Sequence, residues 1–273
     1  MFHNSRKESG LTAALTIAEL VYHASARKIR VTHGNAMIAL LINLMQLFVF
    51  VAAFYVMFSL LGLRNSAVRG DFLLYLMSGI FLYMTHAKTL GAVAGSEGPT
   101  SAMMQHAPMN TVIAILSSAL SALYIQVLAL TIILFVYYMG FQRFVIEDAA
   151  SAFAMLMIAW FGGLAIGTVM LALKPWIPNL ISIVTMIYQR ANMIASGKMF
   201  LANTLPGFML AMFDWNPLFH CIDQARGFTF INYTPRHSSI AYPLIVYGII
   251  LVIGLMGEFY TRRNSSLSLS ARR

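Results

Sequence analysis

The sequence predicts an all-α integral membrane protein with six transmembrane helices, an N-terminal interfacial helix and a re-entrant helical hairpin between spans five and six. The first observation is composition, since 59% of the 273 residues are hydrophobic and 10% are charged, whereas soluble domains carry about 25% charged residues. The second is that the apolar residues fall in long runs. The 18 basic residues outnumber the 9 acidic ones, but they stand at span ends and termini. They therefore indicate topology and lipid contact, and no nucleic-acid partner.

The N-terminal segment, residues 11–30, has the pattern of a basic amphipathic helix. Apolar positions such as Leu15 and Val21 alternate at helical spacing with Arg27, Lys28 and Arg30. The segment is too polar to span a bilayer, so we expect it to lie in the cytoplasmic interface. A soluble surface helix would show the same pattern, but the position just before an apolar run favours the membrane.

Six apolar stretches are long enough to cross a bilayer, which takes about 20 residues. Their predicted bounds are 36–62, 72–93, 111–138, 149–173, 176–195 and 239–260. Residues 1–273 thus form a single transmembrane domain, with a Gly/Pro/Ser-rich connector at 95–110. In the fourth span Gly163 and Gly167 form a small-xxx-small pair, which predicts a close contact with another helix.

The distribution of basic residues predicts the topology. An even number of spans puts both termini on one side of the membrane. Five Lys and Arg residues precede the first span and four follow the last or stand in its final turn, so both termini are expected in the cytoplasm. The 95–110 connector then faces the cytoplasm, and residues 198–236 face outward.

Residues 198–236 are neither a normal span nor a normal loop. Their apolar runs at 208–213 and 218–222 are too short to cross a bilayer, and Pro206, Pro217 and Pro235 interrupt them. Short broken helices of this kind are typical of a re-entrant segment, whose backbone must be satisfied by protein or by a watery cavity. The alternative is an extramembrane loop with amphipathic helices on the surface.

The residues that carry catalysis in other proteins are sparse. The Gly197-Lys198 pair lacks the rest of a phosphate-binding loop, so an ATPase driving this chain would be another polypeptide. We expect no catalytic and no metal site, and the single Cys221 excludes an internal disulfide. His220 and Asp223 have the spacing of a relay, but a capped and hydrated helix end explains them better.

Arginine, tyrosine, tryptophan and phenylalanine residues predict a path for a substrate near the outer surface of the membrane. Arg190 is the ionisable residue deepest in a span, where a charge costs about 2.5–3.5 kcal/mol, so it should face a protein interior or water. The alternative is an Arg that snorkels from a shorter span. Tyr188, Trp215 and Phe219 offer aromatic faces that suit sugar rings, although interface belts are aromatic as well.

Four pieces of sequence occur in a characteristic order over nearly the whole chain. They are ARKIRVTHG before the first span, MMQHAPMNTVIA at the third, DWNPLFHCIDQAR after the fifth and EFYTRR at the end of the sixth. With these pieces the chain resembles the permease subunits of ABC-2 type exporters, in the capsular polysaccharide and O-antigen branch. The WNPLxH…R block is the most specific piece.

The resemblance implies a transport subunit and not an enzyme. It implies a homodimer with two copies of a cytoplasmic ABC ATPase subunit, which bind ATP-Mg, and no cofactor in this chain. The cargo would be a lipid-linked polysaccharide crossing the bacterial inner membrane, passed on to a periplasmic polysaccharide co-polymerase and an outer-membrane export protein. The alternatives are a small-molecule or drug ABC-2 exporter, and an intramembrane enzyme acting on lipid-linked sugars.

The resemblance also suggests residue roles. The N-terminal helix and the 95–110 connector would contact the ATPase and transmit its movement. The expected coupling residues are Arg27, Lys28, Arg30, Glu97, Gln105 and His106. The expected substrate path consists of Arg190, Tyr188, Trp215, Phe219 and Arg226.

Overall fold

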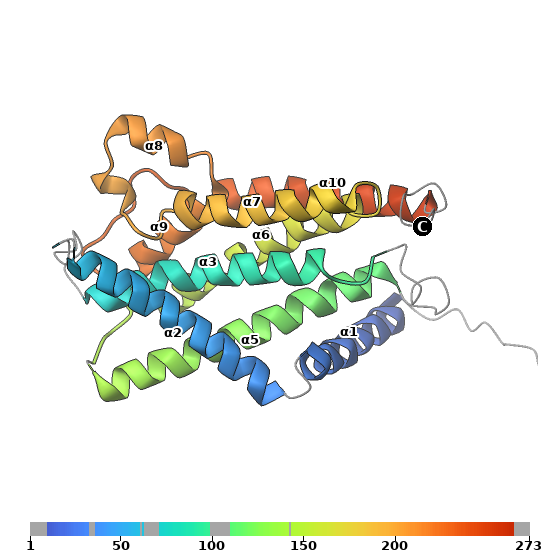
Figure 1. Cartoon of the computed structure of the whole chain (residues 1–273), viewed down its shortest axis with the longest axis horizontal. Helices are drawn as coiled ribbons and strands as arrows, with labels where there is room; N and C mark the ends of the chain where they lie inside the picture. The colour runs from blue at the N-terminus through green and yellow to red at the C-terminus, as the bar shows by residue number, and fades with distance from the viewer. Residues whose placement is uncertain are drawn as a thin grey trace, which may run out of the picture.

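The computed structural model describes residues 10–32, 36–60, 62, 71–98, 110–141 and 143–264 (Figure 1). In these ranges the chain forms nine α-helices, one short 3-10 helix and no strand. This confirms the predicted all-helical architecture for the described part of the chain. Gln105 and His106 lie outside the described residues.

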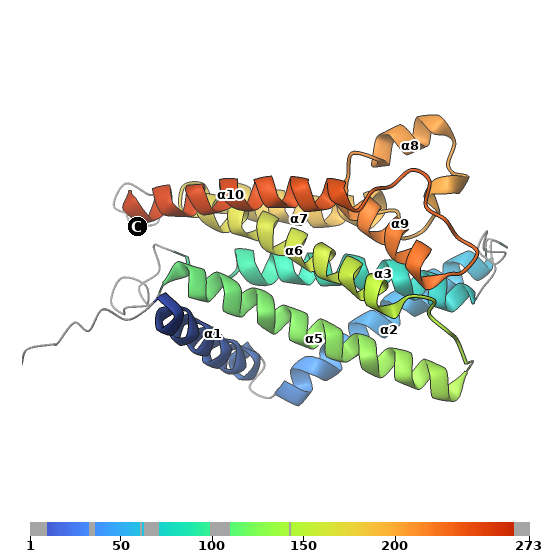
Figure 2. The same cartoon turned by 180° about the vertical axis from the view of Figure 1, so that it is seen from behind.

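Six long helices run side by side along the molecule, as the two opposite views show (Figures 1 and 2). They are α2 (Ala36–Leu60), α3 (Phe72–Ala94), α5 (Thr111–Gly140), α6 (Ala149–Leu173), α7 (Pro178–Ala195) and α10 (Ala241–Arg263). Four of them, α2, α5, α6 and α10, are long and apolar enough to cross a membrane. The protein therefore has the character of a membrane-embedded helical protein, and spanning by α3 and α7 stays a prediction.

The centre of the bundle is α3, which packs against α2, α5, α6 and α9 (Pro217–Thr229). Fifteen of its 23 residues are buried, so most of its surface meets protein and not lipid. This environment accommodates a buried His86, whose Nδ1 donates to the carbonyl of Ala159 at 3.0 Å while Nε2 accepts from the Tyr188 hydroxyl at 3.1 Å. A helix in this position can carry polar groups because neighbouring helices satisfy them.

The contact between α3 and α6 depends on glycines of α6. A Cβ atom on Gly163 would stand 2.4 Å from the carbonyl oxygen of His86, and one on Gly167 would stand 2.8 Å from the Val93 Cβ. The two helices thus approach backbone to backbone at this place. The close helix contact predicted from Gly163 and Gly167 is confirmed.

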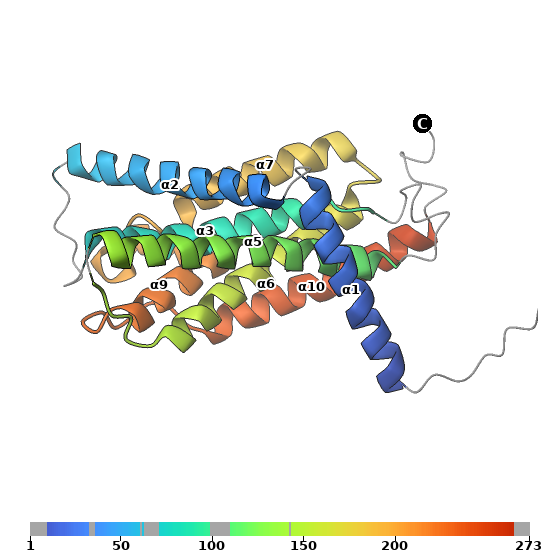
Figure 3. The ribbon, with the colours of Figure 1, turned by 90° about the horizontal axis from the view of Figure 1, so that it is seen from below.

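The first helix, α1 (Gly10–Thr32), crosses the bundle at a steep angle and packs against α5 near the end where the described C-terminal residues lie (Figure 3). A helix across the axis of the bundle has the direction expected of one in a membrane surface. Its place in the cytoplasmic interface stays a prediction.

After α7 the chain forms three short elements at the opposite end of the molecule (Figure 1). These are the 3-10 helix at Ala202–Thr204, α8 (Gly207–Phe213) and α9. Pro217 occupies the first turn of α9, where its missing N–H costs no hydrogen bond. The helices are as short as the sequence predicts, and their re-entry into the membrane stays a prediction.

We expect Gly163→Ala to lower stability by about 1–3 kcal/mol, because the new methyl group meets a backbone oxygen that cannot rotate away. Gly248→Ala is the matched control, since nothing lies within 4 Å of its Cβ position on α10. Cys221 is the only cysteine and is fully buried, so a thiol-reactive fluorophore can report melting in detergent. Equal melting temperatures for the two variants would contradict the close α3–α6 contact.

Candidate functional site

The DWNPLFHCIDQAR motif builds the start of α9 and attaches it to the end of α7. The Asn216 side chain caps α9 by accepting from the N–H of Leu218 at 3.1 Å. Its amide nitrogen donates to the side chain of Asn192 at 2.8 Å and to the carbonyl of Ala195 at 2.9 Å. Asn216 therefore uses both ends of its amide to join two helices.

Arg226, further along α9, is the largest fully buried side chain of the described residues. Its guanidinium donates to the carbonyls of Gly197 at 2.9 Å, Phe200 at 2.6 Å and Lys198 at 2.5 Å, and lies 4.2 Å from the ring centroid of Tyr75 on α3. These carbonyls belong to the segment 196–201 that follows α7. The planar fork of Arg suits this task, since it offers several donors in a fixed geometry.

The same segment needs a glycine at its turn. Gly197 has a φ of +72°, and a Cβ there would stand 2.5 Å from the ring of Phe219. On the other side, Gly79 of α3 leaves room for Arg226 and for the backbone of Lys198, at 2.8 Å and 2.9 Å from its Cβ position. The segment is thus enclosed between α3 and α9 with no space for further side chains.

His220 and Asp223 do not bond each other and instead fasten the chain after α9. His220 Nε2 donates to the carbonyl of Asp214 at 2.6 Å, and its Nδ1 accepts from the N–H of Ser239 at 3.0 Å. The Asp223 carboxylate accepts from the hydroxyls of Tyr233 and Ser238. These bonds form no relay. The expected capped and hydrated helix end is also wrong, because both side chains are buried within α9 and Asn216 is its N-cap.

Lys198 lies in an aromatic cage that no sequence motif indicates. Its Nζ is 4.5 Å, 5.2 Å and 3.8 Å from the ring centroids of Phe50, Phe54 and Tyr83. The residue is 1% exposed, and its Nζ has no hydrogen-bond partner among the described residues. Aromatic faces attract a cation, but they do not replace a carboxylate. The sequence does mark the position, since Lys198 is the one charged residue between Arg190 and Asp214.

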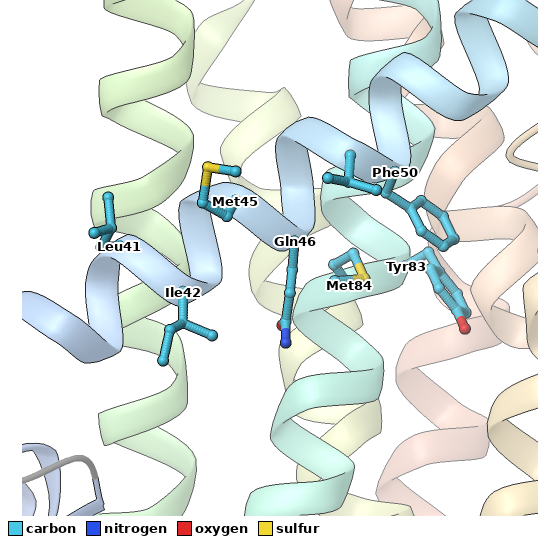
Figure 4. Close-up of a pocket in the computed structure, with 8 residues that line it drawn as sticks. Leu41, Ile42, Met45, Gln46, Phe50, Tyr83 and Met84 are labelled. Atoms are coloured by element: carbon cyan, nitrogen blue, oxygen red, sulfur yellow. The ribbon is translucent and has the colours of Figure 1, made fainter.

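A groove runs beside this cage between α2 and α3, with a volume of about 580 Å³. Phe50 and Tyr83 belong to both the cage and the wall of the groove. The other side chains of the wall are apolar except for Gln46, which extends from α2 toward α3 (Figure 4). An apolar groove thus leads past the caged lysine.

The five residues expected along a substrate path do not share one surface. Arg190 and Trp215 are exposed, Tyr188 is half-buried with its hydroxyl on His86, and Phe219 and Arg226 are 1% exposed. In the described chain Phe219 and Arg226 are interior residues that hold the segment 196–201 and α9. Arg190 and Trp215 are the two with open surface.

The expected coupling residues lie where α1 meets α5 and where α3 ends. Arg27 and Glu97 are exposed, and Lys28 donates to the Ser118 hydroxyl of α5. Burial lowers the pKa of Lys28 from its ordinary value, and the charge of Glu97 opposes this shift. Arg30 lies on α1, and its side chain is outside the described ones.

No protein-family model matches the chain, and no curated protein matches it.

We expect Arg226→Met to lower stability by about 3–5 kcal/mol, because three carbonyls, two of them in fully buried hydrogen bonds, lose their donor. Lys198→Met is the matched control, since it also removes a buried cation, but one that has no hydrogen bond to any described residue. Its stability should stay the same or rise, because a methionine fits an aromatic cage without the cost of a buried charge. Melting followed by labelling of Cys221 compares the two. A larger loss for Lys198→Met would overturn these roles.

Proposed function

We propose that the chain is the transmembrane permease subunit of an ATP-driven exporter. Its cargo is a lipid-linked capsular or related surface polysaccharide, moved across the bacterial inner membrane. Two copies of the chain assemble with two copies of a cytoplasmic ABC ATPase, which binds ATP-Mg, and deliver the polymer to periplasmic and outer-membrane export proteins. The chain itself catalyses no covalent step. The order of the four sequence pieces and the helical bundle with short helices at one end support this proposal.

One observation carries the choice of an anionic cargo. Arg190, Lys198 and Arg226 lie on α7, the segment after it and α9, and none forms an ion pair with a described carboxylate. Of these three cations Arg190 has open surface, so its guanidinium can contact an anionic ligand directly. The phosphate links and acidic sugars of a lipid-linked polymer are anions of that kind.

The exposure of Arg190 supports assembly as a dimer. It lies on a helix whose open face carries Ile183, Met186, Ile187 and Ile194, which are 46% to 61% exposed. An arginine facing lipid at this level would cost about 2.5–3.5 kcal/mol or more. A water-filled channel between two copies of the chain, with α7 at its wall, removes that cost.

The aromatic cage suggests how the channel opens. Phe50 and Phe54 belong to α2, on which the buried residues among the described side chains are Asn43, Leu47, Val51 and Phe54. A displacement of α2 driven by the ATPase would uncover Lys198 to the passing anion, while Arg226 keeps the segment 196–201 in place. The closed state is then the one in which the rings cover the cation, and ATP binding favours the other.

Affinity purification of the tagged chain in mild detergent tests the class of protein. We expect an ATPase subunit to co-elute at a one-to-one ratio and to hydrolyse ATP in a vanadate-sensitive way. The identity of the subunit follows from mass spectrometry. A chain that purifies alone and turns over lipid-linked sugars would instead make it an intramembrane enzyme.

We expect Arg190→Ala to reduce surface polysaccharide about tenfold or more, since loss of a charged contact with the polymer costs about 1.5–3 kcal/mol. Protein levels should stay normal because the side chain is exposed. Arg190→Lys is the matched control, and it should restore most of the export by keeping the charge. Normal export by Arg190→Ala would remove Arg190 from the path.

A further inference from the structure

A small polar pocket lies among α1, α2, α3 and α5, away from the α7–α9 end. Its volume is about 210 Å³, which is the share of about seven water molecules in the liquid. Lys28 of α1 and Lys88 of α3 both line it, and the described lining contains no carboxylate. Two cationic side chains from separate helices therefore converge on one small space.

Neutral acceptors hold both lysines at the wall of the pocket. Lys28 donates to the hydroxyl of Ser118, and Lys88 donates to the side-chain oxygen of Gln46. Glu97 lies close enough for its charge to act on Lys28, but the burial of Lys28 has the larger effect on its pKa. An anion in the pocket would form charge-assisted hydrogen bonds with ammonium groups from two helices.

A pair of buried amides completes the lining. Gln126 Nε2 donates to Asn43 Oδ1 at 3.1 Å, which leaves Asn43 Nδ2 and Gln126 Oε1 without a partner among the described residues. Asn43 is 6% and Gln126 is 3% exposed. Exchange of N and O in both amides would still leave one donor and one acceptor unused. A buried unsatisfied pair of this kind fits a ligand that both accepts and donates hydrogen bonds.

The pocket continues into the apolar groove between α2 and α3, since Ile42 and Gln46 line both cavities. From these residues the groove extends along α2 to Phe50 and along α3 to Tyr83, near the middle of α3 (Figure 4). The polar end thus lies by α1, and the apolar end lies along the exposed face of α2 beside the middle of α3. A ligand that fills both has a charged head and a hydrocarbon tail.

We propose that the pocket and groove bind one anionic glycerophospholipid with a hydroxyl-bearing headgroup, of the phosphatidylglycerol type. Its phosphate lies between Lys28 and Lys88, and a headgroup hydroxyl bonds the Asn43–Gln126 pair. One acyl chain occupies the groove, in the direction of a lipid of the cytoplasmic leaflet. The pocket has no room for a sugar polymer, so the lipid is a resident of the protein and not its cargo. This inference does not depend on the proposed function.

Native mass spectrometry of the delipidated full-length protein, titrated with phosphatidylglycerol, tests the proposal. We expect the double variant Lys28→Gln/Lys88→Gln to bind about 30-fold more weakly, since each of the two basic residues near an anionic headgroup contributes about 1 kcal/mol. Arg263→Gln is the matched control, because Arg263 is exposed on the last turn of α10. An equal loss in the control would mean general surface attraction and would overturn the site.

Lipid chemistry and a second variant give independent outcomes. Phosphatidylglycerol should bind more tightly than phosphatidic acid, which lacks the headgroup hydroxyls, and than phosphatidylcholine, which lacks the net charge. Val49→Trp should also weaken binding, because Val49 lines the groove and is 57% exposed, so the core stays unchanged. Equal affinity for phosphatidylcholine would overturn the proposal. Displacement of phosphatidylglycerol by a polyprenyl phosphate would assign the pocket to an isoprenoid carrier and would overturn it as well.

Discussion

The arrangement of the α7–α9 end depends on the guanidinium of Arg226. A chain that turns inside a helical bundle exposes carbonyl oxygens, and each one left unpaired away from water costs free energy. Arg226 donates to three of them from α9, across a distance of 26 to 29 residues along the chain. The small surface of Gly79 allows α3 to close over this contact. One side chain therefore joins α9, α3 and the segment 196–201 into one packed unit.

Two buried cations in this unit have opposite surroundings. Arg226 donates to three carbonyls, while Lys198 lies against three aromatic rings and has no hydrogen-bond acceptor in the described part of the chain. The first arrangement stabilises the fold. The surroundings of Lys198 keep a charge close to an apolar groove, and two of the rings that cover it, Phe50 and Phe54, belong to α2. Because Arg226 holds the segment 196–201 and Lys198 does not, α2 can move away from Lys198 while the segment keeps its conformation.

The sequence predicted the long helices well, because their apolar runs have clear ends, and the observed bounds lie within three residues of the expected ones. It was less informative about α3, where His86 and Lys88 lower the hydropathy. Contacts from α6 and α7 satisfy His86, and such contacts cannot be seen in a linear pattern. The motif residues Asn216 and Arg226 were expected near a substrate path or as family markers, yet their bonds are internal. Spacing identifies a motif, but only packing shows which way it faces.

The contact of α1 with α5 has a consequence for biosynthesis. Lys28 bonds Ser118, which follows it by 90 residues. At a synthesis rate of about 5–20 residues per second, this partner is made roughly 5–20 s later. During that interval α1 lacks its main partner helix α5, and the surface that α5 covers must be covered by lipid or by the insertion machinery. Its amphipathic character thus serves the nascent chain before it serves the folded one.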